Sequence, residues 1–165
     1  MLRGLNMDRQ LLISSLIDYA GRNHSTTAVV ATDSSGRVHR TNWTQVHRRS
    51  QQVAAALKAE GIERGDRIGT IAWNDHRHLE AYYGITGIGS VLHTVNPRLR
   101  EQQIAWIINH AQDQLVFVDP DFLPIAEKIA AQTASVRFWI VLADGLPKTS
   151  LENAVAYEEW ISQST

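Results

Sequence analysis

The chain has 165 residues, of which 44% are hydrophobic and 20% charged, a composition typical of a globular protein with an ordinary core. Its 16 basic and 17 acidic residues give a formal net charge of -1, so no basic field exists to hold a nucleic-acid backbone, and no nucleic-acid partner is expected. The sequence contains no cysteine, which excludes disulfides, thiolate metal sites and a protein-bound thioester, and fits a reducing cytoplasm.

Neither a secretion signal nor a membrane span is predicted. Arg3, Asp8 and Arg9 place charges among the first nine residues before any apolar run develops, which argues against a signal peptide. The longest uncharged run, residues 81–97, is shorter than the roughly 20 apolar residues of a spanning helix and contains three glycines. We expect a cytoplasmic protein without a transmembrane segment, and peripheral contact with a membrane stays open.

The first part of the chain predicts a helix, a hairpin and a second helix. Apolar side chains at helical spacing predict a helix over residues 9–21, which could dock as an arm. Two strand-like runs, residues 28–33 and 37–43, are joined by Ser-Ser-Gly, whose turn chemistry suits a hairpin. Thr44 is the expected N-cap of the next helix, and Gly61 is expected to end it in a left-handed conformation.

The rest of the chain alternates short apolar strands with helices. Strands are predicted at residues 67–73, 90–94, 115–118 and 137–142, and helices at 75–89, around 104–111 and from 121 to about 133. This order predicts an α/β fold, a doubly wound, mainly parallel sheet flanked by helices, with a small N-terminal hairpin. We expect one domain, which consists of a helical arm (1–24), an α/β core (25–142) and a tail (143–165) with a loop and one short helix.

Most motifs that carry catalysis are absent from the sequence. The seven histidines lie on separate predicted elements without a paired ligand spacing, so no metal site is expected. No serine sits in a G-x-S-x-G elbow, and neither a P-loop nor a G-x-G-x-x-G motif occurs. The sequence therefore predicts no catalytic residue.

Glycines and aromatic residues around the helix at 75–89 are expected to serve packing. Three glycines should allow close helix packing and a tight turn into the next strand: Gly84, Gly87 and Gly89. Four aromatic side chains are expected in the core: Trp73, Tyr82, Tyr83 and Trp106.

One basic residue is a candidate for ligand binding. Arg98 follows Asn96 and Pro97 at the carboxyl end of a predicted strand, which is the edge where open α/β sheets bind ligands. The residues alone leave open whether Arg98 binds a ligand or is simply an exposed arginine.

Several segments together resemble the N-terminal part of the acyl-CoA synthetases of the AMP-forming adenylating superfamily, in particular the long- and medium-chain fatty-acid ligases. The segments are TQV (44–46), AAAL (54–57), GIERGDRI (61–68), HLEAYY (78–83) and VLHTVNPRL (91–99). The similarity in element order extends from Leu12 to about Trp160.

The resemblance implies a two-step ligase reaction for the intact enzyme. A fatty-acid carboxylate attacks the α-phosphate of ATP, with Mg²⁺ accompanying the nucleotide, and CoA then displaces AMP from the acyl-adenylate. In the family the phosphate loop, the adenine- and ribose-binding motifs and the catalytic lysine lie downstream of the matching region. None of these motifs is in this sequence, so the chain alone is expected to be inactive and to have no demonstrable cofactor of its own.

The resemblance also implies roles for particular residues. Arg98 matches an Asn-Pro-Arg position that in some acyl-CoA ligases contacts the nucleotide phosphate of CoA, a task that suits bidentate, charge-assisted hydrogen bonds. The arm that begins at Asp8 and ends at Arg22 resembles the segment through which some long-chain members dimerise, which implies a homodimer. Arg100 stands where relatives often place a Ser or Thr helix cap, so the next helix is expected to begin less firmly.

Two other hypotheses stay open at this point. The chain could be a free-standing binding or dimerisation module that has kept the fold and lost the enzyme. A small flavodoxin-like nucleotide binder is the third hypothesis, and the missing phosphate loop disfavours it.

Overall fold

The structure is a computed structural model, and it describes residues 11–163. Its main sheet is formed by β3 (Arg67–Ile71), β4 (Val91–Thr94), β5 (Leu115–Val118), β6 (Phe138–Val141) and β7 (Ala154–Ala156). The five strands are parallel and lie in the order β4-β3-β5-β6-β7. The predicted α/β class with a mainly parallel sheet is therefore confirmed.

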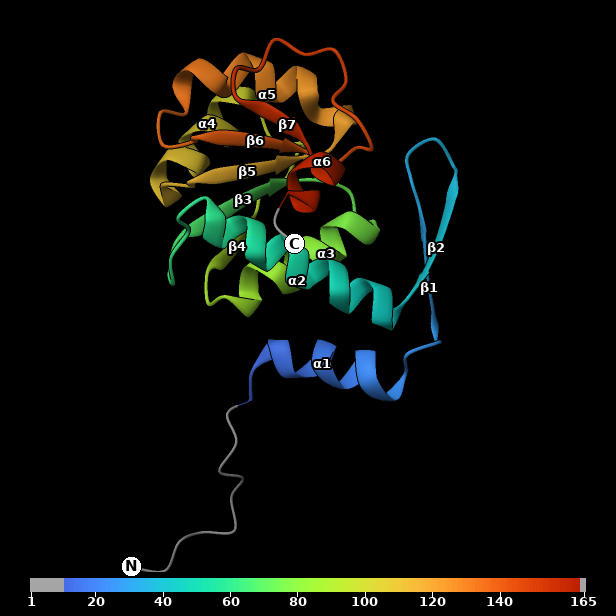
Figure 1. Ribbon diagram of the computed structural model, residues 1–165. Helices are drawn as coiled ribbons and strands as arrows, with labels where there is room; N and C mark the ends of the chain where they lie inside the picture. Colours follow the sequence, from blue (N-terminus) through green and yellow to red (C-terminus); the bar gives the residue numbers. More distant parts are fainter. Residues whose placement is uncertain (1–10, 164–165) are drawn as a thin grey trace, which may run out of the picture.

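Helices cover both faces of this sheet (Figure 1). One face is covered by α2 (Trp43–Ala59), α3 (His76–Gly87) and α6 (Tyr157–Ser162). The other is covered by α4 (Glu101–Ala111) and α5 (Leu123–Ile129), the latter between the 3-10 turns η1 (Pro120–Phe122) and η2 (Ala130–Gln132). The body is thus a three-layer, doubly wound α/β/α arrangement.

The central strand β5 contributes to the core on both faces because side chains alternate along a strand. Leu115 and Phe117 pack towards α2, α3 and α6, and the Phe117 ring lies 5.6 Å from that of Trp160. Val116 and Val118 face α4 and α5. All four β5 side chains are fully buried, as expected for a parallel strand with helices on both sides.

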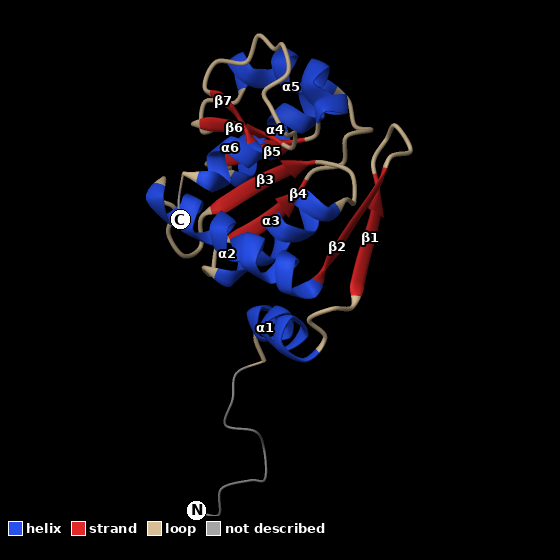
Figure 2. Cartoon of the chain, turned by 45° about the vertical axis from the view of Figure 1, so that its right-hand side comes forward, coloured by secondary structure: helices blue, strands red, loops and turns tan. Residues whose placement is uncertain are grey.

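The first helix and the N-terminal hairpin lie outside the main sheet. Helix α1 (Ile13–Asn23) packs on α2 and α3 and buries Ile17. Strands β1 (Ala28–Thr32) and β2 (Val38–Asn42) pair antiparallel, which confirms the predicted hairpin, and they stand beside the body in both views (Figures 1 and 2). Residues 9–10 of the predicted first helix lie outside the described part of the chain.

The N-cap of α2 is Asn42, so the prediction of Thr44 was wrong. The Asn42 Oδ1 atom accepts a hydrogen bond from the Gln45 backbone N–H at 2.9 Å, and asparagine is a stronger N-cap than threonine. The Thr44 hydroxyl instead donates to the Gly21 carbonyl at 3.2 Å and ties α2 to α1. At the other end, Gly61 has a φ of 75°, which confirms the left-handed stop.

The packing role of the glycines in and after α3 is confirmed at two positions. A Cβ atom at Gly84 would lie 2.6 Å from Cγ1 of Val53, so this glycine allows α2 and α3 to approach closely. Gly89 has a φ of 83° in the turn before β4. At Gly87 an added Cβ would meet nothing within 4 Å, so packing does not require a glycine there.

The prediction that four aromatic side chains lie in the core was wrong for two of them. Trp106 is 63% exposed on the outer side of α4, and Trp73 is 39% exposed after β3, where its indole N–H donates to Asp121 at 2.9 Å. Tyr82 and Tyr83 are half-buried on α3. For Trp106, the spacing of apolar residues does not by itself say which edge of an amphipathic helix reaches solvent.

The tail contains a strand that the sequence did not predict. β7 pairs with β6 at the edge of the sheet, with Val155 opposite Ile140. At three residues it is too short for an alternation pattern to be detected. Within residues 11–163, none of the helices combines the length and apolar character needed to cross a bilayer.

Candidate functional site

The carboxyl ends of the parallel strands form the edge of the sheet at which a ligand site is expected. The chain runs from β3 outwards to β4 and then returns to β5 on the opposite side of β3. This reversal places a topological switch point between β3 and β5, and open α/β sheets bind ligands in the crevice outside such a point.

Polar side chains surround this switch point. A cavity of about 330 Å³ is lined there by Asp75, Arg77, Asp119, Asp121 and Asp144, among others. The Asp119 carboxylate accepts a hydrogen bond from the Asp121 backbone N–H at 3.1 Å. Burial raises the pKa of Asp119 to about 6, and the carboxylates of Asp121 and Asp75 add to the rise. Asp119 is therefore about half protonated near pH 6.

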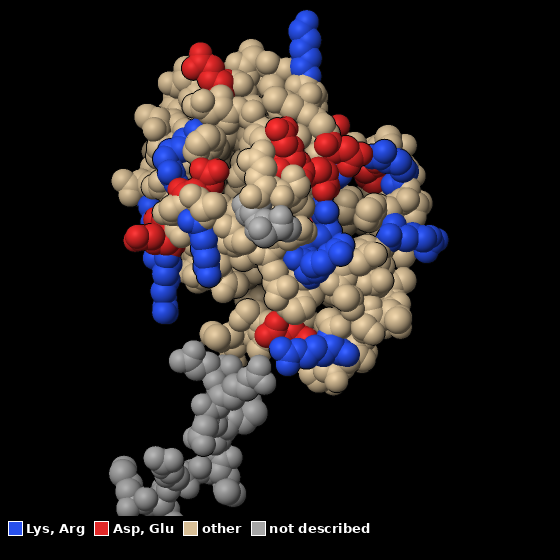
Figure 3. Space-filling view, in the orientation of Figure 1, with Lys and Arg blue, Asp and Glu red and all other residues tan. Residues whose placement is uncertain are grey.

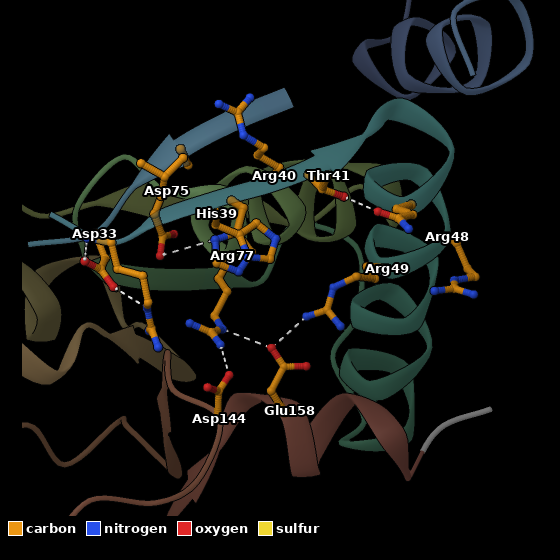
Figure 4. A pocket seen from close by; sticks show the side chains of 15 residues that line it. Asp33, His39, Arg40, Thr41, Arg48, Arg49, Asp75, Arg77, Asp144 and Glu158 are labelled. Carbon is orange, nitrogen blue, oxygen red and sulfur yellow. Dashed lines mark hydrogen bonds and ion pairs between the residues drawn. The ribbon is translucent and has the colours of Figure 1, made fainter. Parts of the chain in front are cut away.

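Arg77 connects this edge to the last helix. Its guanidinium donates from Nε to Glu158 of α6 at 3.0 Å, from Nη1 to the Leu142 carbonyl after β6 at 3.4 Å, and from Nη2 to Asp144. Arg77 itself is only 8% exposed, whereas the Asp144 side chain is 75% exposed and that of Glu158 is 29% exposed. Figure 4 shows Arg77 pointing at both carboxylates.

A second arginine, Arg49, belongs to the same network. Arg49 of α2 donates from Nε to Glu80 at 2.8 Å and from Nη2 to Glu158 at 2.9 Å. Glu80 is 1% exposed and also accepts a hydrogen bond from the Tyr157 hydroxyl at 2.8 Å. Burial raises the pKa of Glu80, whereas Arg49 and Arg77 lower that of Glu158 against the effect of burial. The network thus fixes α2, α3 and α6 relative to one another.

The hairpin meets the body through two stacked histidines. The rings of His39 on β2 and His76 on α3 have centroids 3.6 Å apart and planes inclined by 11°. Burial lowers the pKa of His76 to about 4, so this imidazole is neutral at physiological pH. His78, two residues on, contacts the Thr70 hydroxyl at 3.1 Å, so the two α3 histidines have different partners.

A larger cavity, of about 550 Å³, lies between the hairpin and the body. Five arginines from β2, its preceding turn, α2 and α3 line it: Arg37, Arg40, Arg48, Arg49 and Arg77. Figure 4 shows the converging ion pairs at its floor, and Figure 3 shows acidic side chains gathered between the body and the hairpin tip, with basic side chains just below them. Charges of both signs are therefore concentrated on this side of the molecule.

Arg98 lies where the sequence placed it, in the exposed turn after β4. Its backbone N–H donates to Asn96 Oδ1 at 3.0 Å, and Arg98 is not among the residues that line the 330 Å³ cavity. Its role in ligand binding stays a prediction.

The start of α4 lacks a Ser or Thr cap, as predicted from Arg100, but the Gln103 side chain supplies a hydrogen bond there. The Gln103 side chain accepts a hydrogen bond from the Arg100 backbone N–H at 3.1 Å, which is the reciprocal half of a capping box. An arginine side chain has no acceptor and cannot supply the other half. The helix therefore has one of the two hydrogen bonds of that motif.

The structure also brings together a pair that sequence reasoning did not find. His93 on β4 contacts the fully buried Asp113 through Nδ1 at 2.8 Å, and burial raises the pKa of that carboxyl. A Cβ on Gly69 would lie 3.0 Å from the same carboxylate, so the glycine leaves room for it. Within residues 11–163 no group of three or more potential ligands could hold a metal ion.

Sequence reasoning also missed Arg77, Arg49 and Glu158 as network members. Their partners are 31 to 109 positions away in the chain, so no local spacing reveals the pairs.

Comparisons with known proteins agree with this architecture. A model of the family described as AMP-binding enzyme matches residues 17–164. The chain is 45% identical over 139 residues to the 3-methylmercaptopropionyl-CoA ligase of Ruegeria lacuscaerulensis, which covers 84% of this chain and 26% of that protein. It is 41% identical over 162 residues to the medium-chain-fatty-acid–CoA ligase of Ectopseudomonas oleovorans, which covers 97% of this chain and 30% of that protein.

A solved structure supports the fold. The crystal structure of an anthranilate CoA ligase in complex with anthranoyl-AMP matches 95% of this chain and 29% of its own, with a TM-score of 0.81 and 20% identity. The chain spans less than a third of the length of the curated relatives that it matches.

Proposed function

Because the chain belongs to the AMP-binding enzyme family, we propose that it forms the N-terminal part of an ATP-dependent fatty-acid–CoA ligase. The observation that carries this proposal is the 41% identity to a medium-chain-fatty-acid–CoA ligase over 162 residues. The proposed enzyme uses fatty acid, ATP with Mg²⁺, and CoA. The fatty-acid carboxylate displaces pyrophosphate from ATP to form an acyl-adenylate, and the CoA thiol then displaces AMP.

Within that enzyme, these 165 residues contribute binding and positioning. The sequence holds neither a phosphate loop nor a nucleophile motif. The carboxyl edge of the sheet presents Arg98 to the solvent, and Arg77 holds the loop after β6 against α6. We therefore propose that the 165-residue chain alone is inactive.

The coding sequence beyond Thr165 tests the proposal directly. A reading frame that continues into a phosphate loop and adenylation motifs supports it, and a stop codon directly after Thr165 contradicts it. Fatty-acid-dependent exchange of pyrophosphate into ATP should occur with the protein from the whole reading frame and not with the 165-residue chain. Exchange by the short chain would refute its proposed inactivity.

Arg98 is proposed to bind the nucleotide phosphate of CoA. In the protein from the whole reading frame, Arg98→Ala should raise the Michaelis constant for CoA about tenfold or more, because a charge-assisted contact contributes roughly 1.5–3 kcal/mol. Adenylate formation, measured by pyrophosphate exchange, should stay nearly unchanged. Arg100→Ala, two residues away and also exposed, is the matched control, and equal effects of the two changes would exclude a specific role for Arg98.

We also propose a homodimer through the arm from residue 8 to residue 22. In its described part, the cap residue of α1 and the helix itself expose apolar side chains: Leu12, Ile13, Leu16 and Tyr19, between 41% and 62% exposed. A cytoplasmic location is proposed because the sequence contains no cysteine. We also propose peripheral membrane contact through the same apolar side chains, which a vesicle-flotation assay tests.

A further inference from the structure

A stack of two histidine rings joins the hairpin to the body. His39 of β2 lies over His76 at the start of α3, with ring centroids 3.6 Å apart. His76 is only 8% exposed, whereas His39 keeps contact with solvent. Among residues 11–163, no hydrogen bond or ion pair joins residues 28–40 to α3 or to the main sheet. The attachment of the hairpin to α3 therefore depends on this stack and on the apolar side chains around it.

The hairpin forms a wall of two cavities. The 550 Å³ cavity and a second cavity of about 410 Å³ share Ala31, Asp75 and His76 as lining residues. The second cavity is lined by apolar side chains from three elements, among them Val29 of β1, Leu79 of α3 and Leu92 of β4. His76 thus lies where the two cavities meet, and a movement of the hairpin away from α3 opens both of them.

The electrostatic surroundings of His76 oppose its protonation. Burial lowers the pKa of His76 to about 4, the Asp75 carboxylate opposes this shift, and His39, Arg77 and Arg49 add to it. The Asp75 carboxylate is 3.9 Å from Nδ1 of His76, too far for a hydrogen bond. The other charged residues that line the 550 Å³ cavity with His76 are Asp33, Arg37, Arg40, Arg48, Asp144 and Glu158.

We propose that the stack of His39 on His76 is a pH-sensitive latch, which holds the hairpin on α3 while both rings are neutral and releases it, opening the two cavities, when they are protonated. Neutral aromatic rings can lie face to face with an offset, whereas two imidazolium ions 3.6 Å apart repel each other. Protonation of His76 also places a charge at a buried position without a hydrogen-bonded carboxylate. This latch does not rest on the proposed ligase reaction.

The direction of the pH dependence follows from proton linkage. When the hairpin is released, His76 is exposed to water and its pKa returns towards the ordinary 6.5, whereas the pKa is about 4 while the hairpin lies on α3. Between these two values the attached state therefore binds fewer protons than the released state. The equilibrium constant for attachment is largest above pH 7 and falls by up to about 25-fold between pH 7.5 and pH 5. Below pH 4, His76 causes no further weakening.

Amide hydrogen exchange of the unmodified 165-residue chain tests the latch, with protection factors corrected for the intrinsic pH dependence of exchange. A hairpin of two strands is marginally stable by itself, so β1 and β2 should lose protection once they leave α3. From pH 7.5 to pH 5, the protection of β1 and β2 should fall at least fivefold more than that of β5 and β6. An unchanged hairpin, or an equal fall in all four strands, would overturn the proposal.

Variants assign the effect to the two rings. The double change His39→Phe and His76→Phe keeps two aromatic rings and removes both protonation sites, so the protection of the hairpin should stay within twofold between pH 7.5 and pH 5. His110→Phe is the matched control, because the His110 ring also stacks on an aromatic ring, that of Trp106, at an exposed position outside both cavities. A pH response of the hairpin that survives the double change, or that His110→Phe removes, would contradict the latch.

A titration followed by NMR keeps the proposal testable if the double variant does not fold. In the unmodified chain, the amide shifts of β1 and β2 must change together with the ring signals of His39 and His76. Amide shifts of the hairpin that follow a different histidine, or that do not change between pH 7.5 and pH 5, would exclude the latch.

Discussion

Asp119 is the residue whose ionisation most directly links stability to pH at the carboxyl edge. Its pKa rises from 3.8 when unperturbed to about 6 in the folded protein, chiefly through burial. Between about pH 4 and pH 6 the folded state therefore binds more protons at this site than the unfolded state. By linkage, the contribution of Asp119 to the free energy of unfolding falls as the pH rises through this window.

Asp119→Asn should remove the free-energy cost of ionising a buried carboxyl group. The asparagine side-chain oxygen can still accept the hydrogen bond from the Asp121 N–H. We expect the variant to be about 3 kcal/mol more stable than the unmodified chain at pH 7.5, with the difference vanishing near pH 4. Urea denaturation followed by circular dichroism across this range measures it. Glu152→Gln, at an exposed position, is the control, and a difference for Asp119→Asn that does not change with pH would contradict the assignment.

Glu80 holds the buried end of the ion network. Glu80→Ala would leave Arg49 Nε and the Tyr157 hydroxyl without their acceptor, and removal of one partner from a buried pair is expected to cost about 3–5 kcal/mol of unfolding free energy. Glu80→Gln keeps an acceptor and should cost less. Denaturant titration compares both with Glu152→Ala, and a loss at Glu80 no larger than at Glu152 would show that the network does not stabilise the fold.

Residue-level prediction succeeded where the cause is local. Arg98 follows a strand and a proline, so its position at the carboxyl edge could be inferred, and Gly61 and Gly89 stand at turns that require a positive φ. The Arg77–Glu158 and His93–Asp113 pairs depend on long-range packing and leave no local pattern. The CoA role of Arg98 and the absence of catalytic residues stay predictions.

Contact between α2 and α3 depends on Gly84. Gly84→Ala would place a Cβ 2.6 Å from Val53 Cγ1 and 2.9 Å from the Ser50 carbonyl, so the two helices must move apart. We expect a loss of about 1–3 kcal/mol, as for other overpacked cores. Gly87→Ala on the same helix meets no atom within 4 Å and should be neutral or stabilise by about 0.5–1 kcal/mol. Thermal melting measures both, and equal destabilisation would refute the close-packing argument.

At the scale of elements, the order of most helices and strands was predictable because each carries its own period and end signals. The failures have physical causes. Asn42 and Thr44 are both good N-caps, but asparagine is the stronger, and the Thr44 hydroxyl binds the distant Gly21 carbonyl instead. β7 pairs with the open edge of β6. It was not predicted because its three residues are too few to show an alternation pattern.

At the scale of the whole molecule, assembly can be tested through α1. If the arm dimerises, analytical ultracentrifugation should show a concentration-dependent dimer, and Leu16→Asp should weaken it at least tenfold by placing a charge in the apolar side of α1. Leu146→Asp, in the loop before β7 and also partly exposed, is the matched control. A monomer at all concentrations, or a dimer that Leu16→Asp does not affect, would exclude this interface.

The position of α6 also has a consequence for synthesis in the cell. Tyr157, Trp160 and Ile161, almost at the end of the chain described, fill the core on the α2 and α3 side of the sheet. Domains fold during synthesis, and the ribosome adds about 5–20 residues per second. Until Ile161 has emerged, Leu115, Phe117 and the acidic group of Glu80 lack their covering helix. Nascent chains that stall before this point would expose apolar surface and become targets for chaperones.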